Sequence, residues 1–149
     1  MADEAREQIA ESIDAIEGAY EFFLAYAAQG ITEESQSSRV GAQLRTHLDR
    51  METAVSGLGT LIGSFLEEEE VGSADQVEAF RRLVEADAVR ARAVLSLVQA
   101  QESVTSQLVD NLNASVHVRT LLTDLFLLDE VLKLGVDQGT APEASESVP

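Results

Sequence analysis

Apolar residues near the start of the chain recur at alternating steps of four and three positions, at Ile9, Ile13, Ile16, Tyr20, Phe23 and Ala27. This heptad spacing puts all of them on one stripe of a helix. Asp3 and Glu4 lie in the expected first turn, where the helix dipole favours carboxylates. Gly30 is suited to the left-handed conformation that ends many helices. The pattern therefore predicts a helix over about residues 3–29.

The next stretch has the most regular heptad pattern of the chain, at Val40, Leu44, Leu48, Met51, Val55, Leu58, Ile62 and Phe65. Thr32 is a suitable N-cap and the pattern ends by Glu70, so we expect one helix over about residues 32–70. Gly59 and Gly63 lie on one face of it. Because glycine within a helix costs up to about 1 kcal/mol relative to alanine, the two glycines predict close approach of a neighbouring helix. A kink or a ligand slot is the alternative.

A third helix is predicted from the segment 73–76, Ser-Ala-Asp-Gln, which matches a capping box. The apolar face that follows comprises Val77, Phe80, Val84, Ala88, Ala91, Leu95 and Val98. Residues 102–106, Glu-Ser-Val-Thr-Ser, favour caps over helix interiors and predict a turn. A fourth helix is expected over about residues 104–134. Since neither glycine nor proline enforces the turn, one long merged helix is the alternative.

Four amphipathic helices with short links are typical of an all-α, antiparallel four-helix bundle with up-down-up-down topology. We expect this bundle to occupy residues 1–135, as the one domain that a chain of 149 residues usually forms. Residues 136–149 are acidic and polar and contain both prolines, Pro142 and Pro149. They predict a disordered C-terminal tail.

The net charge of −17 excludes several classes of partner. Binding to nucleic acid or to an anionic membrane surface would be unfavourable, so we expect neither. An acid-rich chain with a single lysine, Lys133, is typical of salt-adapted proteins, in which charge serves solubility. Attraction to basic partners is the alternative. The acidic start does not resemble a secretory signal, and the apolar run 22–28 is shorter than the ~20 residues that span a bilayer, so we expect a cytoplasmic protein.

Residues 67–70 are four consecutive glutamates at the C-terminal end of the predicted second helix, where they oppose the helix dipole. We expect Arg81 and Arg82, on the returning helix, to pair with Glu67 or Glu70. A bound cation or a basic partner is the alternative interpretation.

No catalytic motif is present, so we expect no enzymatic activity, metal or cofactor. The chain has no cysteine, which excludes thiolate metal sites and a cysteine nucleophile. Ferritin-like di-iron proteins need Glu three residues before His, but His47 follows Leu44 and His117 follows Ala114 at that spacing. A zinc-protease helix motif and a glycine-rich phosphate loop are also missing from the sequence.

His47 is the first candidate for a site, because it falls near the centre of the apolar stripe of the predicted second helix. In an antiparallel hairpin it would lie level with Glu17. A buried polar group needs a partner, so we predict a structural Glu17–His47 pair at the edge of the core. The alternative is a small-ligand or metal site, possibly catalytic, that uses His47, Glu17 and Tyr20.

A second candidate is a polar sector of the predicted fourth helix, made of Asp110, Asn113, His117 and Asp124. We interpret it as a solvated polar stripe. The alternative is a pH-sensitive or metal-binding face, because the two aspartates would stabilise a charged imidazolium.

The second half of the fourth helix is apolar around nearly its whole circumference, with Leu121, Leu122, Leu125, Phe126, Leu127, Leu128, Val131, Leu132 and Leu134. A peripheral bundle helix needs only one apolar stripe, so a second chain is the expected cover. We predict a subunit interface at Leu121, Leu127, Leu128 and Val131. The sequence thus favours a non-enzymatic interaction, scaffolding or regulatory protein that forms a homodimer or higher homo-oligomer and binds protein partners. A ligand- or metal-binding bundle is the alternative.

Overall fold

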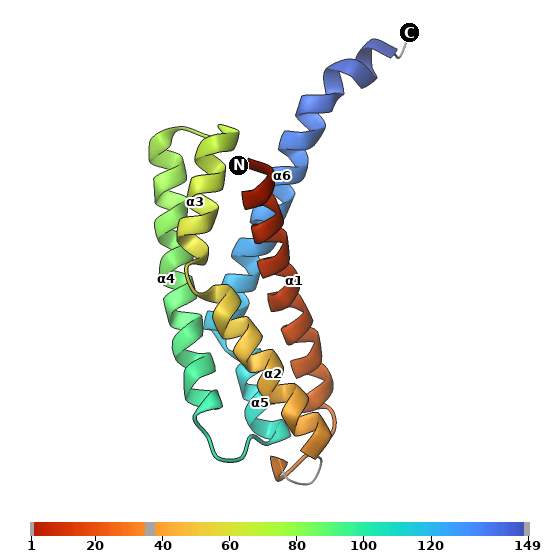
Figure 1. Cartoon of the computed structure of the whole chain (residues 1–149), viewed down its shortest axis with the longest axis vertical. Helices are drawn as coiled ribbons and strands as arrows, with labels where there is room; N and C mark the ends of the chain where they lie inside the picture. The colour runs from red at the N-terminus through yellow and green to blue at the C-terminus, as the bar shows by residue number, and fades with distance from the viewer. Residues whose placement is uncertain (1, 35–37, 148–149) are drawn as a thin grey trace.

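The computed structural model describes the backbone of residues 2–34 and 38–147 and the side chains of residues 4–34 and 39–133. Every regular element in this part is a helix: α1 (Ala2–Ala27), α2 (Ser38–Val55), α3 (Leu58–Glu69), α4 (Ala74–Gln99), α5 (Ser106–Ala114) and α6 (Val116–Ser147). α2 and α3 follow one another in the same direction, as do α5 and α6, and both pairs run opposite to α1 and α4 (Figure 1). The predicted all-α class is confirmed. Six helices are found in place of four, so the four-helix bundle is not confirmed.

The predicted second helix is divided because Gly57 adopts a left-handed conformation, with φ 73° and ψ 6°, directly before α3. Residues other than glycine rarely adopt this backbone conformation. Val55, before the break, and Leu58, after it, are both buried, so the apolar spacing continues across the break. The periodicity therefore conceals the break, and it also misplaced the helix start, because Thr32 lies in the turn that precedes α2.

The predicted fourth helix is divided at Ser115, whose backbone is extended with φ −58° and ψ 125°. The turn before it is confirmed: α4 ends at Gln99, and Thr105 caps α5 by accepting a hydrogen bond from the Leu108 N–H at 3.0 Å. The merged helix is therefore wrong. The predicted disordered tail over 136–149 lies outside the residues whose side chains are described, and stays a prediction. In the described part of the chain, no helix is both long and apolar enough to cross a membrane.

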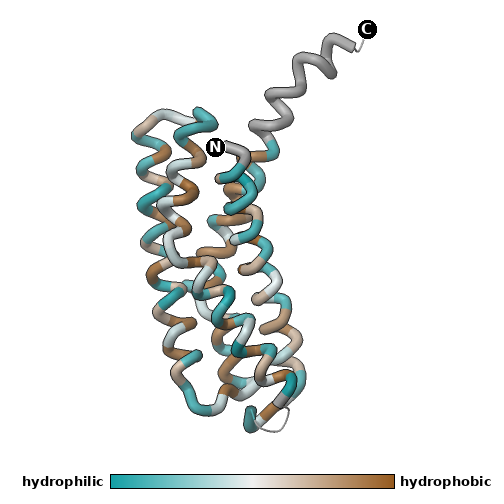
Figure 2. The backbone as a smooth tube through the Cα atoms, viewed as in Figure 1, coloured by the Kyte–Doolittle hydropathy of each residue, from teal (hydrophilic) through white to brown (hydrophobic). Residues whose placement is uncertain are grey.

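The buried apolar side chains form one core cluster, and apolar and polar residues alternate along the described part of each helix (Figure 2). Its largest fully buried side chains are Tyr26, Phe23, Phe65, Ile16, Leu44, Leu48, Met51, Leu58, Ile62, Leu95, Leu121 and Leu125. Most come from the heptad positions identified in the sequence. The periodicity thus identified the inner faces, because burial removes apolar surface from water wherever the stripes meet.

α3 and α4 approach each other closely at the two predicted glycines, which confirms that interpretation of Gly59 and Gly63. A Cβ atom on Gly59 would lie 2.8 Å from the Cβ and 3.0 Å from the Cα of Glu85. On Gly63 it would lie 2.7 Å from the Cγ and Cδ atoms of Arg81. These distances are too short for carbon atoms in contact, so a side chain at position 59 would press on the backbone of α4, and one at position 63 would displace the side chain of Arg81.

Gly59→Ala is expected to lower the free energy of unfolding by about 1–3 kcal/mol, because the added methyl group forces α4 away from α3. Gly18→Ala is the matched control: a Cβ there would have no atom within 4 Å, and removal of a helical glycine should raise stability by about 0.5–1 kcal/mol. Urea denaturation followed by circular dichroism measures both. A Gly59→Ala variant as stable as the wild type would contradict the close contact.

Candidate functional site

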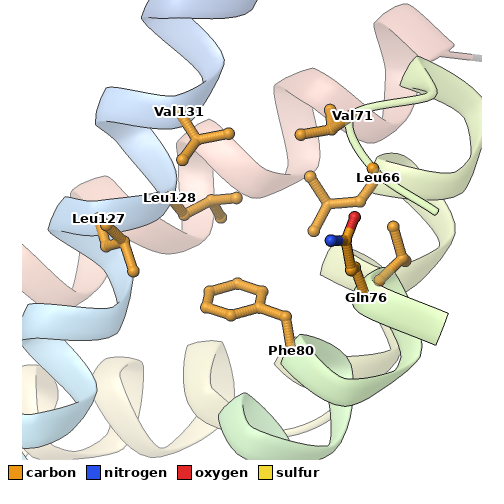
Figure 3. A pocket seen from close by; sticks show the side chains of 9 residues that line it. Leu66, Val71, Gln76, Phe80, Leu127, Leu128 and Val131 are labelled. Carbon is orange, nitrogen blue, oxygen red and sulfur yellow. The ribbon is translucent and has the colours of Figure 1, made fainter. Parts of the chain in front are cut away.

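An apolar groove of about 190 Å³ opens between α6 and the hairpin formed by α3 and α4. Leu127, Leu128 and Val131 project into it from α6, opposite Leu66 and Phe80 of the hairpin (Figure 3). The full lining consists of Leu66, Val71, Gly72, Gln76, Val77, Phe80, Leu127, Leu128 and Val131. An enclosed apolar cavity of about 150 Å³ holds a benzene molecule. The groove therefore has room for one large apolar side chain or ring.

The polar side chain of this lining, Gln76, already forms a hydrogen bond within the chain. Gln76 Oε1 accepts a hydrogen bond from the Ser73 N–H at 3.0 Å, and the Gln76 N–H donates to Ser73 Oγ at 3.2 Å. These two bonds form the capping box that was predicted at the start of α4. Since the capping box engages Gln76 Oε1, the groove offers an almost entirely apolar surface.

The predicted subunit interface is only partly exposed. Leu121 and Leu128 are 0% and 2% exposed within the single chain, so they offer a partner little surface, and the interface itself stays a prediction. α6 directs both into the core that α4 and α1 share with it. Leu127 is 56% exposed, its neighbour Phe126 is 55% exposed, and Val131 is half-buried. Near the groove, the described part of α6 therefore offers Phe126, Leu127 and the edge of Val131 as apolar surface.

The hairpin segment that supplies part of the groove lining also carries several carboxylates. The segment 67–80 contains Glu67, Glu68, Glu69, Glu70, Asp75 and Glu78 and no lysine or arginine. We call these six residues the acidic rim. The predicted pairing with the returning helix is wrong, because Arg81 and Arg82 both bind Glu78 on their own helix, at 2.6 and 3.1 Å. Pairs three or four residues apart on one helix form without bringing distant segments together.

The Glu17–His47 pair is not formed. Among the described residues, no hydrogen bond or ion pair joins these side chains, and the imidazole of His47 instead stacks on the ring of Phe22 with centroids 4.5 Å apart. Burial lowers the pKa of His47, and the charge of Arg50 lowers it further. Glu17 and Tyr20 are half-buried on α1. The described residues contain no group of three histidine, aspartate or glutamate side chains that could hold a metal ion, and a ligand-binding role for His47, Glu17 and Tyr20 stays a prediction.

The predicted polar stripe is divided between surface and interior. Asp110 and His117 are exposed, whereas Asn113 is 7% exposed and the Oδ2 atom of Asp124 is buried. Neither amide atom of Asn113 has a hydrogen-bond partner among the described residues. The interpretation as one solvated stripe is wrong, because α5 buries Asn113 while it exposes Asp110, and α6 partly buries Asp124 while it exposes His117.

Asp124 faces a second carboxyl group, Asp87 of α4, which is 9% exposed. Burial raises the pKa of Asp124 to about 8, and the hydrogen bond and the charge of Asp87 contribute to the rise. Two carboxylates at close range cannot both ionise readily, so the pair retains a proton. The guanidinium of Arg90 lies 3.4 Å from Asp87 Oδ1. No sequence pattern pointed to this pair, because its members lie on different helices.

A polar cluster at the opposite end of the molecule was also missed. Arg45 donates to both carboxylate oxygens of Glu34, at 2.8 and 3.2 Å, and to the carbonyl oxygens of Gln99 and Gln101, at 2.6 and 2.7 Å. Burial alone would raise the pKa of Glu34, but hydrogen bonds from Arg45 and from the Val104 N–H lower it below the usual value. These bonds tie the α1–α2 connection to the α4–α5 turn, so the role of this cluster is structural.

Comparison of the chain with protein-family models, with curated proteins and with solved structures finds no match. Function is therefore inferred from the chemistry of the surface alone. Within the described part of the chain, the groove and the adjacent Phe126 and Leu127 bring apolar side chains to one place on the surface.

Proposed function

We propose that this chain is a non-enzymatic interaction module that binds its own copies through the exposed part of α6 and other protein chains through the groove beside it. The observation that carries the proposal is the pair Phe126 and Leu127, which stand next to each other with more than half of each side chain in water. Covering one such side chain stabilises a complex by roughly 1.5–3 kcal/mol. A patch of large apolar side chains on a soluble chain commonly marks a site of protein contact.

Self-association through α6 is the first form of this function that we expect. In a two-fold contact each copy contributes the same surface, so each apolar side chain is buried twice in the complex. Phe126 points away from the core but does not line the groove. A contact centred on Phe126 would therefore leave part of the groove open for a different partner.

The double variant Phe126→Glu with Leu127→Glu is expected to be a folded monomer, whereas the wild type associates. Both side chains lie outside the core, so the new carboxylates should not disturb folding, and they would be costly to bury between two chains. Sedimentation velocity over a range of concentrations measures the association, and circular dichroism checks the fold.

Leu97→Glu is the matched control, because Leu97 is 67% exposed on α4 but stands apart from the groove lining. It should leave association unchanged. A wild-type protein that stays monomeric at roughly 100 μM, where even weak specific dimers form, would contradict self-association.

A further inference from the structure

The acidic rim and the groove lining alternate along the same short stretch of chain. Leu66, Val71 and Val77 line the groove, and Glu67, Glu70 and Asp75 lie between them and are exposed. Any segment that enters the groove from the hairpin side must therefore pass close to several carboxylates. The surface combines an apolar floor with a strongly negative edge.

Most of the rim is not neutralised within the chain. Glu69 binds Arg6 at 3.1 Å, and Glu78 binds Arg81 and Arg82. Within the described side chains, no ion pair involves the other four members of the rim, which are Glu67, Glu68, Glu70 and Asp75. On the facing helix, Lys133 is engaged with Asp129 at 3.4 Å. The groove thus lies in a field of uncompensated negative charge, which attracts cationic partners.

We propose that the groove binds a basic amphipathic helix of a partner protein. This inference rests on the proposed function of the chain as an interaction module. One large apolar or aromatic residue of the partner helix fills the groove between Phe80 and Leu127, a space large enough for one ring. Lysine and arginine residues on the flanks of that helix meet the acidic rim. This is the helix-in-groove mode of recognition, in which apolar anchors recur three or four residues apart.

A second copy of the chain is a poor occupant of the groove. It would bring the same six acidic residues and another −17 charges to the contact. Like charges placed opposite each other oppose association and are weakened only by salt. The part of the partner surface nearest to the groove must therefore have the opposite sign.

The test uses a labelled synthetic helix about 18 residues long, with leucine and phenylalanine on one face and lysine on the other, long enough to be partly helical in water. Fluorescence anisotropy should show that it binds the full-length wild-type protein. A peptide with glutamate in place of every lysine should not bind. The triple variant Glu67→Gln, Glu68→Gln, Glu70→Gln should weaken binding about tenfold at low salt. Each exposed ion pair contributes little binding free energy, but the contributions of three pairs add together. At roughly 1 M salt the difference should vanish.

A second triple variant, Glu21→Gln with Asp49→Asn and Asp110→Asn, is the charge-matched control. All three residues are exposed and lie outside the groove lining and the rim, so this variant should bind the peptide like the wild type. Val71→Glu places a charge on the groove wall at a residue that is 41% exposed, and it should abolish binding while the protein stays folded.

The outcomes separate this inference from the proposed function. If neither peptide binds but the wild type self-associates and Phe126→Glu with Leu127→Glu dissociates it, the basic helix is wrong and the interaction module stands. If Val71→Glu also dissociates the self-associated protein, a second copy fills the groove and the inference is overturned. Equal weakening by the two triple variants would show attraction to overall charge and would likewise overturn it. If the wild type is monomeric but binds the basic peptide, the basic-helix inference is supported and the proposed self-association is contradicted.

Discussion

Asp124→Asn is expected to make the protein more stable at pH 8 and to remove much of the pH dependence of its stability. The pKa of Asp124 is raised to about 8 in the folded chain, whereas an aspartate in an unfolded chain has a pKa of about 3.9. Between these values the unfolded chain has lost a proton that the folded chain retains. The stabilising contribution of the protonated pair is therefore complete below pH ~4 and is lost as the pH rises through about 8.

The side-chain amide that this variant introduces at position 124 does not titrate, so it could donate a hydrogen bond to Asp87 at every pH. Asp124 is only partly buried, so solvent screening reduces the effect, and we expect a gain of about 1–3 kcal/mol at pH 8. Urea denaturation at several pH values between 4 and 9 measures it.

Asp110→Asn is the matched control, since it makes the same change of charge at an exposed position on α5. It tests whether relief of the net negative charge alone accounts for any gain. If the two variants show the same dependence of stability on pH, the buried carboxyl pair does not retain its proton.

Arg45→Met is expected to destabilise the fold by about 2–4 kcal/mol, the largest loss we predict for a residue outside the apolar core. The variant removes every hydrogen bond that Arg45 makes to Glu34 and to the α4–α5 turn. The side chains of Arg45 and Glu34 are 26% and 20% exposed. The carboxylate of Glu34 would therefore stay largely removed from water without its cation, although the Val104 N–H still donates to it.

Arg50→Met is the control for Arg45→Met, because Arg50 is exposed on the same helix. It should change the free energy of unfolding by less than about 0.5 kcal/mol. Arg45→Lys should be intermediate, since lysine keeps the charge but not the planar group that binds two oxygens of Glu34 at once. If Arg45→Met is as stable as Arg50→Met, the cluster does not hold the two connections together.

The sequence alone determined which face of each helix is buried. Ile16, Phe23 and Leu48 occupy heptad positions and are at most 1% exposed. Helical periodicity reveals such positions because each depends only on residues three or four places away. Local chemistry likewise predicted the capping box at Ser73 and the turn before Thr105. Gly59 and Gly63 predicted the close contact of α3 with α4, because glycine within a helix needs a reason to be there.

The breaks at Gly57 and Ser115 were decided by the tertiary structure. In both places an apolar pattern continues through a backbone that is no longer helical. The exposure of the expected stripe of Asp110, Asn113, His117 and Asp124 was also decided by the tertiary structure: Asp110 and His117 are exposed, Asn113 is buried and Asp124 is partly buried. The packing of α5 and α6 decides which of these side chains meet water, and their spacing in the sequence does not reveal it.

The groove, the carboxyl pair and the Arg45 cluster also depend on contacts between segments far apart in the chain. Arg45 is 54 residues from Gln99, and the groove joins Leu66 to Val131. No local pattern encodes such contacts, because they arise only when packing of the apolar stripes sets the positions of the helices. The sequence thus determined the helices and their inner faces from short-range periodicity. The tertiary structure alone decided where α6 leaves the α3–α4 hairpin uncovered, and with it the surface on which we place the function.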